Sequence, residues 1–258
     1  VVDDIVVCGA EPLFMTDYIA TGKVVPERIA AIVGGIAKGC ELAGVALVGG
    51  ETAEHPGLLD PDEYDVAGAA TGVVEHDEVL GPDRVAAGDV VIALASSGLH
   101  SNGYSLARKV LLEEAKLALD ARPEGLGRPL VDALLEPTRI YVKDTLALMK
   151  AVKLKGLSHI TGSGIPGNLP RCLPEGTRAV LREGAWKRPP IFDLIQRLGS
   201  VERAEMYDTF NMGLGLIAVV APEDVAVALA LLEARGVEAY EVGQVEAGSG
   251  EATAVITP

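Results

Sequence analysis

One stretch of the sequence, SSGLHSNGYS over residues 96–105, gathers side chains that acid–base and phosphate chemistry use. Ser97 precedes its histidine, His100, and a hydroxyl and an amide, Ser101 and Asn102, follow directly. His100 is the only side chain here that titrates near neutral pH, so it is a candidate general acid or base. A lone histidine is usually structural, and that interpretation stays open. No GxSxG motif occurs, which argues against a serine-hydrolase triad built on that turn.

A second stretch, HITGSGIPGNLPR over residues 159–171, places three glycines, Gly162, Gly164 and Gly167, among polar and turn residues. Glycine amides of such a loop can cradle a phosphate. The stretch matches neither GxxxxGK[ST] nor a well-placed GxGxxG, which argues against a P-loop or a Rossmann site. A third stretch, MYDTFNMGLG over residues 206–215, ends before an apolar strand, where Asn211 and Gly213 suit ligand contact or form a plain turn.

Acidic residues follow or interrupt two apolar segments near the start of the sequence. Asp3 and Asp4 lie within VVDDIVV, and Glu51 follows the glycine pair Gly49 and Gly50 in GGETAEHPG. Buried acids need a cation or hydrogen-bond donors, so Asp3 and Asp4 are candidate metal ligands. The alternative is an edge strand with one acid facing water. Glu51 is predicted either to hold Mg²⁺ or a ligand hydroxyl, or to be a solvated turn residue.

The elements that position these residues follow from periodicity and turn signals. Pro26 and Gly44 bound a clear amphipathic helix, because proline suits the first helical position and glycine the left-handed position after the end. The first segment, 1–7, is predicted as a strand, and 49–57 as a loop after strand 45–48. A turn-rich stretch at 81–88 is the candidate domain boundary. Further strands are expected at 64–74, 90–94, 157–160, 177–181, 214–220, 238–245 and 252–257, and further helices at 105–116, 138–152, 190–198 and 222–235.

Strands and helices interleaved in this way indicate an α/β or α+β fold with a mixed sheet. The formal net charge of −15 argues against nucleic acid and anionic membranes as partners, since both need a basic patch. No apolar run approaches the roughly 18 residues of a membrane-spanning helix. Three dispersed cysteines without a CxxC indicate a reducing compartment, and with no signal peptide expected we predict a cytoplasmic location.

Taken together, these stretches resemble phosphoribosylformylglycinamidine cyclo-ligase, the family also called aminoimidazole ribonucleotide synthetase. The matching segments occur in the family's order and cover nearly the whole sequence: GAEPLFMTDYIATGK, LVGGETAEHPG, YDVAGAATGVVE, SSGLHSNGYSLARK, EPTRIYVK, HITGSGIPGNLPR and MYDTFNMGLG. The combination is specific, although no single motif is. The resemblance implies an enzyme of purine biosynthesis that uses ATP and Mg²⁺ to close the imidazole ring of formylglycinamidine ribonucleotide, releasing ADP and phosphate.

The family's fold implies two α+β domains, here expected at 1–82 and 83–258. The first would be a truncated barrel-forming domain that pairs with its copy in a homodimer, and the second a larger mixed α/β layered domain. By resemblance, Asp4 and Glu51 would serve the metal, and His100, Asn102 and His159 the reacting groups. The expected contacts to nucleotide and ribonucleotide are Gly49, Gly50, Ser97, Ser101, Thr161, Gly162, Gly164, Asn211 and Gly213.

The sequence departs from the family at several places. The family has a long N-terminal region with a glycine-rich segment and an Asp-Gly-Val-Gly-Thr-Lys motif, and neither occurs here, so we expect a truncated chain with weakened nucleotide binding. The family usually has Asn at Asp3 and Gly at Ser163. Two alternatives stay open. One is a sister ATP-dependent family of the same fold, such as selenophosphate synthetase, thiamine-monophosphate kinase, the hydrogenase maturation dehydratase or the synthetase of the preceding purine step. The other is a non-catalytic dimerising fragment.

Overall fold

The computed structural model describes residues 1–258, which divide into two compact units. The first contains residues 1–79 together with 140–147, and the second contains residues 80–139 together with 148–258. The segment 140–147 is thus separated in sequence from the unit with which it packs. Two hydrogen bonds hold it there: Tyr141 N donates to Asp3 Oδ1 (2.9 Å), and Lys143 Nζ donates to the Glu41 carbonyl (3.0 Å).

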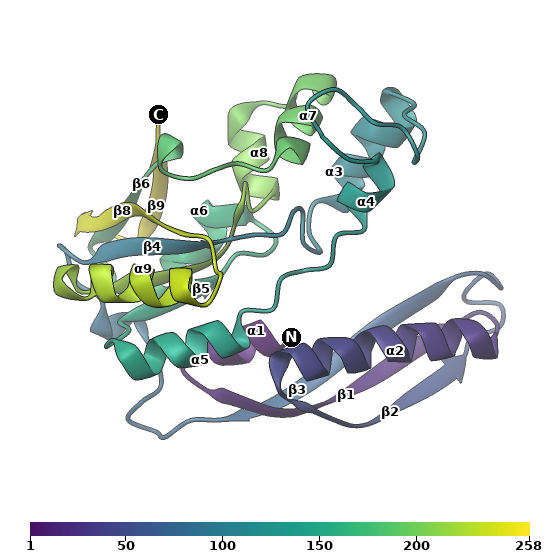
Figure 1. Ribbon diagram of the computed structural model, residues 1–258, viewed down its shortest axis with the longest axis horizontal. Helices are drawn as coiled ribbons and strands as arrows, with labels where there is room; N and C mark the ends of the chain where they lie inside the picture. Colours follow the sequence, from purple (N-terminus) through teal and green to yellow (C-terminus); the bar gives the residue numbers. More distant parts are fainter. The chain divides into compact units, whose positions relative to one another are not determined.

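The first unit is a three-stranded sheet in the order β2-β1-β3 with a long helix along one face (Figure 1). Strand β1 pairs in parallel with β2 and antiparallel with β3. The helix, α2, confirms the predicted helix at 26–44: Pro26 is its first residue, and Gly44 follows its end with φ of 81°. The elements of this unit are α1 (Val2–Val6), β1 (Glu11–Thr21), α2 (Pro26–Ala43), β2 (Ala46–Glu54) and β3 (Tyr64–Val73).

The strand predicted at residues 1–7 is wrong, because these residues form the short helix α1. Asp3 and Val6 are buried and Asp4 is exposed, which is helical spacing. A short apolar run fits a buried helix turn as well as a strand, so periodicity could not separate the two. The carboxylate of Asp3 accepts the Tyr141 amide, which satisfies this buried acid with a backbone donor.

The predicted loop 49–57 is wrong over its first half, because β2 continues through the glycine pair to Glu54. Gly50 is opposite Asp17 of β1, and a Cβ atom at Gly50 would lie 1.8 Å from the Asp17 carboxylate. The absence of a side chain at Gly50 therefore makes room for Asp17 within the sheet. Strand β1 itself was not predicted.

The two faces of this sheet differ in what covers them. Met15 of β1 lines a small apolar cavity with Ile36 and Cys40 of α2, so its side of the strand faces the helix. By the alternation of a strand, Phe14, Thr16 and Tyr18 lie on the opposite side. Phe14 and Tyr18 remain 38% and 39% exposed. In Figure 1 no other element of the first unit lies over this second face.

The second unit is built on a six-stranded sheet in the order β5-β7-β4-β8-β6-β9. All neighbouring pairs are antiparallel except β6 and β9, so the predicted mixed sheet is confirmed. Every residue of β7 is buried, which means that both faces of the sheet are covered along this strand. Its strands are β4 (Val90–Ala95), β5 (Gly156–His159), β6 (Thr177–Arg182), β7 (Leu214–Val220), β8 (Ala239–Ala247) and β9 (Thr253–Thr257).

The helices that follow β3 along the chain, in either unit, are mostly short. The predicted helix 105–116 is a single α-helical segment, α3, followed by a π-helical one, and the predicted helix 138–152 begins only at Val142. Helices α4, α6 and α8 were not predicted. The helical segments are η1 (Pro82–Arg84), α3 (Tyr104–Arg108), η2 (Lys109–Glu114), α4 (Leu130–Leu134), α5 (Val142–Ala151), α6 (Gly164–Asn168), η3 (Leu169–Cys172), η4 (Glu183–Ala185), α7 (Pro190–Gly199), α8 (Arg203–Thr209), η5 (Pro222–Asp224) and α9 (Val225–Ala234). None of the helices is both long and apolar enough to span a bilayer.

Candidate active site

Three of the polar loops meet at one edge of the six-stranded sheet. β7 pairs antiparallel with β4 on one side and with β5 on the other. Its first residues therefore lie beside the last residues of both neighbours: Leu214 is opposite Ala95, and Leu216 is opposite His159. The loops 96–103, 160–163 and 210–213 consequently start or finish at the same end of these three strands.

His100 is a buried histidine in a left-handed backbone conformation, with φ of 58°. Its Nε2 accepts a hydrogen bond from the Ser97 amide at 3.1 Å. Burial, followed by the electrostatic effect of the nearby His159 and Arg139, lowers the pKa of His100 to about 4. The ring is therefore neutral at pH 7, and because Nε2 is the acceptor, the proton lies on Nδ1. In this state His100 is suited to donate a hydrogen bond rather than to take up a proton.

A hollow of about 330 Å³ lies beside His100 and is lined by polar and apolar residues from two segments, with Leu134, Leu135 and Pro137 as the apolar ones. Ser101 and Tyr104 come from the loop after β4 and the start of α3, and Glu136 and Thr138 from the facing segment. Three contacts hold the segments together: Ser97 Oγ donates to Pro137 O (2.6 Å), Ser101 Oγ contacts Thr138 Oγ1 (3.1 Å), and Tyr104 donates to Leu134 O. Ser97 thus helps to hold the two segments together, whereas Ser101 lines the hollow itself.

Asn211 is buried, and both ends of its side-chain amide are used within the protein. Nδ2 donates to the carbonyls of Gly98 (2.9 Å) and Leu99 (3.2 Å). Oδ1 accepts from Ser96 Oγ (3.0 Å) and from the Gly213 amide (2.8 Å). Asn211 therefore fixes the His100 loop to the start of β7. Its expected contact with a ligand, like that of Gly213, stays a prediction.

The glycine-rich loop after β5 is held in the same way by a second buried amide, Asn168. Its Nδ2 donates to the carbonyls of Gly162 (2.9 Å) and Gly164 (2.7 Å), and its Oδ1 accepts from Thr161 Oγ1 (3.3 Å). Gly164 has φ of 54°, and a Cβ atom there would meet the Tyr207 carbonyl at 1.8 Å. Only glycine fits this position, whether or not it also contacts a ligand. Gly162 is exposed.

The structure brings several predicted residues of the second unit together. Asn102 lies close to Gly162, since its Oδ1 is 3.5 Å from where a Cβ atom of that glycine would be. His159, at the end of β5, is near enough to His100 to contribute to its low pKa. The His100 loop, the Asn102 amide and the glycine-rich loop thus lie near one another, and groups of these kinds are suited to binding and stabilising an anion.

Four predicted site residues belong to the first unit: Asp4, Gly49, Gly50 and Glu51. Asp4 is exposed on α1, and Glu51 is exposed on β2 opposite Tyr18. The chain contains no group of three or more His, Cys, Asp or Glu side chains placed to hold a metal. The metal role of Asp4 and Glu51 stays a prediction.

Sequence reasoning missed three contributors to this region: Asn168, Glu136 and Thr138. Asn168 lies in the stretch HITGSGIPGNLPR, and the available signal is a polar residue at the end of a short apolar segment. Glu136 and Thr138 lie in EPTR, about 35 residues after the His100 loop, and no local pattern indicates that the two segments meet.

Solved structures share this fold at low sequence identity. The E. coli hydrogenase maturation protein HypE aligns with a TM-score of 0.71 and 20% identity, over 99% of this chain and 73% of that one. A structure of HypE in complex with ATP aligns with a TM-score of 0.69 and 18% identity, over 99% of this chain and 73% of that one. At these identities the likeness establishes the fold alone.

Sequence comparisons are more specific. Residues 1–74 match the model of the AIR synthase related protein N-terminal domain, and residues 86–256 match that of its C-terminal domain. The phosphoribosylformylglycinamidine cyclo-ligase of Myxococcus xanthus is 69% identical over 257 residues, which are 100% of this chain and 74% of that protein. The Bacillus subtilis protein of that name is 50% identical over 249 residues, 96% of this chain and 72% of that protein. The chain belongs to the phosphoribosylformylglycinamidine cyclo-ligase family.

Proposed function

We propose that this chain carries out the ATP-dependent ring closure of formylglycinamidine ribonucleotide to aminoimidazole ribonucleotide, with release of ADP and phosphate, as a step of purine biosynthesis. The observation that carries the proposal is the 69% identity over the full chain to a cyclo-ligase. The meeting of the His100, Gly162 and Asn211 loops supports the proposal, because three loops at one place can form a single anion-binding region.

The chemistry of ring closure accounts for such a region. An amide oxygen is a poor leaving group, so its attack on the γ-phosphorus of ATP, with ADP leaving, converts it into an iminophosphate. The neighbouring amidine nitrogen then bonds to the activated carbon, the carbon–oxygen bond to phosphate breaks, and the nitrogen loses a proton. Negative charge accumulates on phosphoryl oxygens in both steps, and fixed hydrogen-bond donors stabilise it.

The geometry supports specific roles in these steps. The neutral imidazole of His100 would donate from Nδ1 to a phosphoryl oxygen, since Nε2 already accepts the Ser97 amide. Ser101 and Asn102 would donate beside it, and the amides around Gly162 would bind phosphate. His159, on the neighbouring strand, is the remaining candidate for taking up the proton. ATP as the phosphoryl donor is supported by the ATP complex of a protein with the same fold.

A direct assay tests the proposal. The purified chain is given formylglycinamidine ribonucleotide, ATP and Mg²⁺, and the aminoimidazole product is measured colorimetrically after diazotisation alongside ADP. The full-length Myxococcus xanthus relative serves as the positive control. We expect ADP and aminoimidazole in equal amounts. Phosphorylation of thiamine monophosphate would instead place the chain with that kinase. The absence of any turnover under conditions where the relative is active would support the non-catalytic alternative.

A further inference from the structure

Two consecutive residues next to Asn211 adopt left-handed backbone conformations. Met212 has φ of 51° and Gly213 has φ of 104°. Glycine adopts such angles freely, but methionine does not, so the conformation at Met212 has to be imposed by its surroundings. Met212 is almost fully buried, and its carbonyl accepts a hydrogen bond from Trp186 Nε1 at 2.9 Å. The peptide between Met212 and Gly213 is thus held at its carbonyl by Trp186 and at its amide by Asn211 Oδ1.

The segment that carries Trp186 also sets the position of Gly213. A Cβ atom at Gly213 would lie 2.7 Å from Pro189 Cδ and 3.2 Å from the Lys187 carbonyl, so residues 187–189 pack directly on this glycine. Trp186 itself is only 7% exposed. The indole and the following backbone therefore support residues 212 and 213 together.

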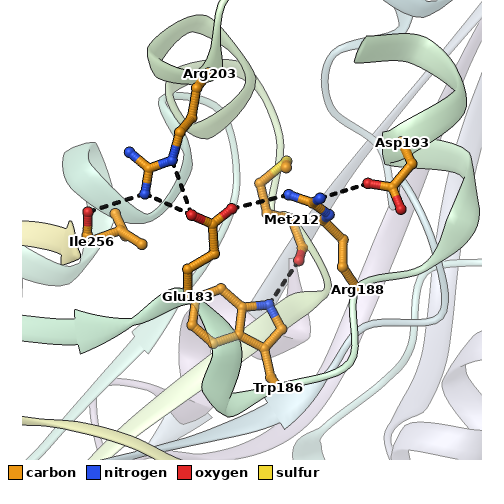
Figure 2. Close-up of polar contacts among 7 residues, drawn as sticks. All are labelled: Glu183, Trp186, Arg188, Asp193, Arg203, Met212 and Ile256. Carbon is orange, nitrogen blue, oxygen red and sulfur yellow. Dashed lines mark hydrogen bonds and ion pairs between the residues drawn. The ribbon is translucent and has the colours of Figure 1, made fainter. Parts of the chain in front are cut away.

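A cluster of ion pairs, formed by Glu183, Arg188, Asp193 and Arg203 and called the polar bracket below, holds this segment in place, as Figure 2 shows. Glu183 accepts from Arg188 Nη1 at 3.1 Å and from Arg203 Nε at 2.9 Å. Arg188 also pairs with Asp193 of α7 at 2.7 Å, and Arg203 of α8 donates to the Ile256 carbonyl at 3.1 Å. The bracket ties the Trp186 segment to two helices and a strand, which makes it a rigid support.

What this support positions is the candidate active site. The Gly213 carbonyl accepts from the Ser96 amide at 2.8 Å, and the Gly213 amide donates to Asn211 Oδ1. Asn211 in turn fixes the backbone of Gly98 and Leu99, directly before His100. Contacts thus run without a gap from Trp186 through Met212 and Asn211 to the His100 loop.

We propose that Trp186 is a positioning residue of the active site. It holds Met212 in its left-handed conformation and thereby keeps the Asn211 amide hydrogen-bonded to the backbone of the His100 loop. The inference rests on the proposed function for its catalytic readout only. Trp186 itself is not proposed to touch a reacting atom. It acts through the peptide that it hydrogen-bonds.

The test compares Trp186→Phe with Leu232→Ala, a core substitution in α9 that serves as a stability-matched control. Hydrogen exchange of peptides covering 96–103 and 210–214 is measured by mass spectrometry, together with kcat and KM. We expect Trp186→Phe to speed exchange in both loops about tenfold and to lower kcat about tenfold, with KM changing less. Leu232→Ala should lower the melting temperature without either effect.

A double variant tests the route through the strained peptide. Met212→Gly removes the need for an imposed conformation, so in that background Trp186→Phe should change loop exchange by no more than about threefold. If Trp186→Phe does not fold, Glu183→Gln loosens the bracket instead, and a smaller increase in exchange in both loops is expected. Unchanged loop exchange, or the same increase in the control, overturns the proposal. Loop exchange that responds in a chain without cyclo-ligase activity would uphold the inference while overturning the proposed function.

Discussion

At the scale of single residues, the state of His100 decides which chemistry the site can perform. Its Nε2 lone pair is engaged by the Ser97 amide, and its pKa of about 4 keeps the ring neutral over the physiological range. A group held in this way stabilises an oxyanion by donation and is a weak base. Loss of one such donor lowers kcat by about 10²–10³-fold in other enzymes, so His100→Ala should do the same.

The low pKa also makes stability depend on pH. The unfolded histidine titrates at 6.5 and the folded one at about 4, so between these values the unfolded chain binds more protons. The contribution of the neutral His100 to the free energy of unfolding is therefore fully present above pH 6.5 and is lost as the pH falls towards 4. We expect wild-type protein to lose about 2–3 kcal/mol more unfolding free energy than His100→Asn between pH 7 and 4.5. Asparagine is the matched replacement because it tolerates positive φ. If denaturant titrations show that both proteins lose the same unfolding free energy between pH 7 and 4.5, the low pKa of His100 is refuted.

Ser163 offers another residue-level prediction, because this serine has φ of 72°, a backbone conformation that favours glycine. A left-handed serine is strained by about 1–2 kcal/mol, and glycine in turn loses about 0.5–1 kcal/mol more conformational entropy on folding. Ser163→Gly should therefore stabilise the protein by about 0.5 kcal/mol. Ser105→Gly, in the right-handed helix α3, is the control and should destabilise by about 0.5–1 kcal/mol. If both substitutions change the unfolding free energy in urea equally, backbone strain at Ser163 is not the cause.

At the scale of elements, the glycine-rich turn between β5 and α6 depends on one buried amide. In Asn168→Asp a carboxylate would face the carbonyl oxygens of Gly162 and Gly164 where a donor now stands. We expect a loss of about 3 kcal/mol in urea unfolding, because two buried acceptors lose their donor and a charge is buried. KM for the phosphorylated substrate should rise in the protein that remains folded. Asn102→Asp, at a partly exposed position, should change stability by less than about 0.5 kcal/mol.

Elements with strong local signals were predictable, and those shaped by distant contacts were not. Helix α2 carries its proline start and glycine end in the sequence, and the continuous apolar run of β7 marks a central strand. By contrast, β2 continues through Gly49 and Gly50 because both residues pair with β1, where Gly50 leaves room for the Asp17 side chain, and no local pattern encodes this pairing. The candidate site follows the same division. His100 is evident from its neighbours, but Asn168 and Trp186 gain their roles only through carbonyls that the fold brings to them.

At the scale of the whole molecule, the uncovered face of the three-stranded sheet and the net charge act in opposite directions. Phe14 and Tyr18 leave apolar surface exposed on that face, together with small residues of β3 such as Ala67 and Ala69. Such a surface favours association with a second copy, in keeping with the homodimer expected for the family. Each copy carries a formal charge of −15, which opposes association at low ionic strength.

We therefore expect a homodimer that forms through this face and is stabilised by salt. Sedimentation velocity at micromolar concentration should show dimers, and the dissociation constant should fall as NaCl rises from 20 to about 300 mM, because screening weakens the repulsion between the two acidic copies. Phe14→Asp places a charge in the middle of the apolar face and should raise the dissociation constant about 100-fold or more. Val227→Asp, at an exposed position of α9, adds the same charge elsewhere and should change it only slightly. A monomer at all salt concentrations, or equal weakening by both substitutions, would exclude this face as the interface.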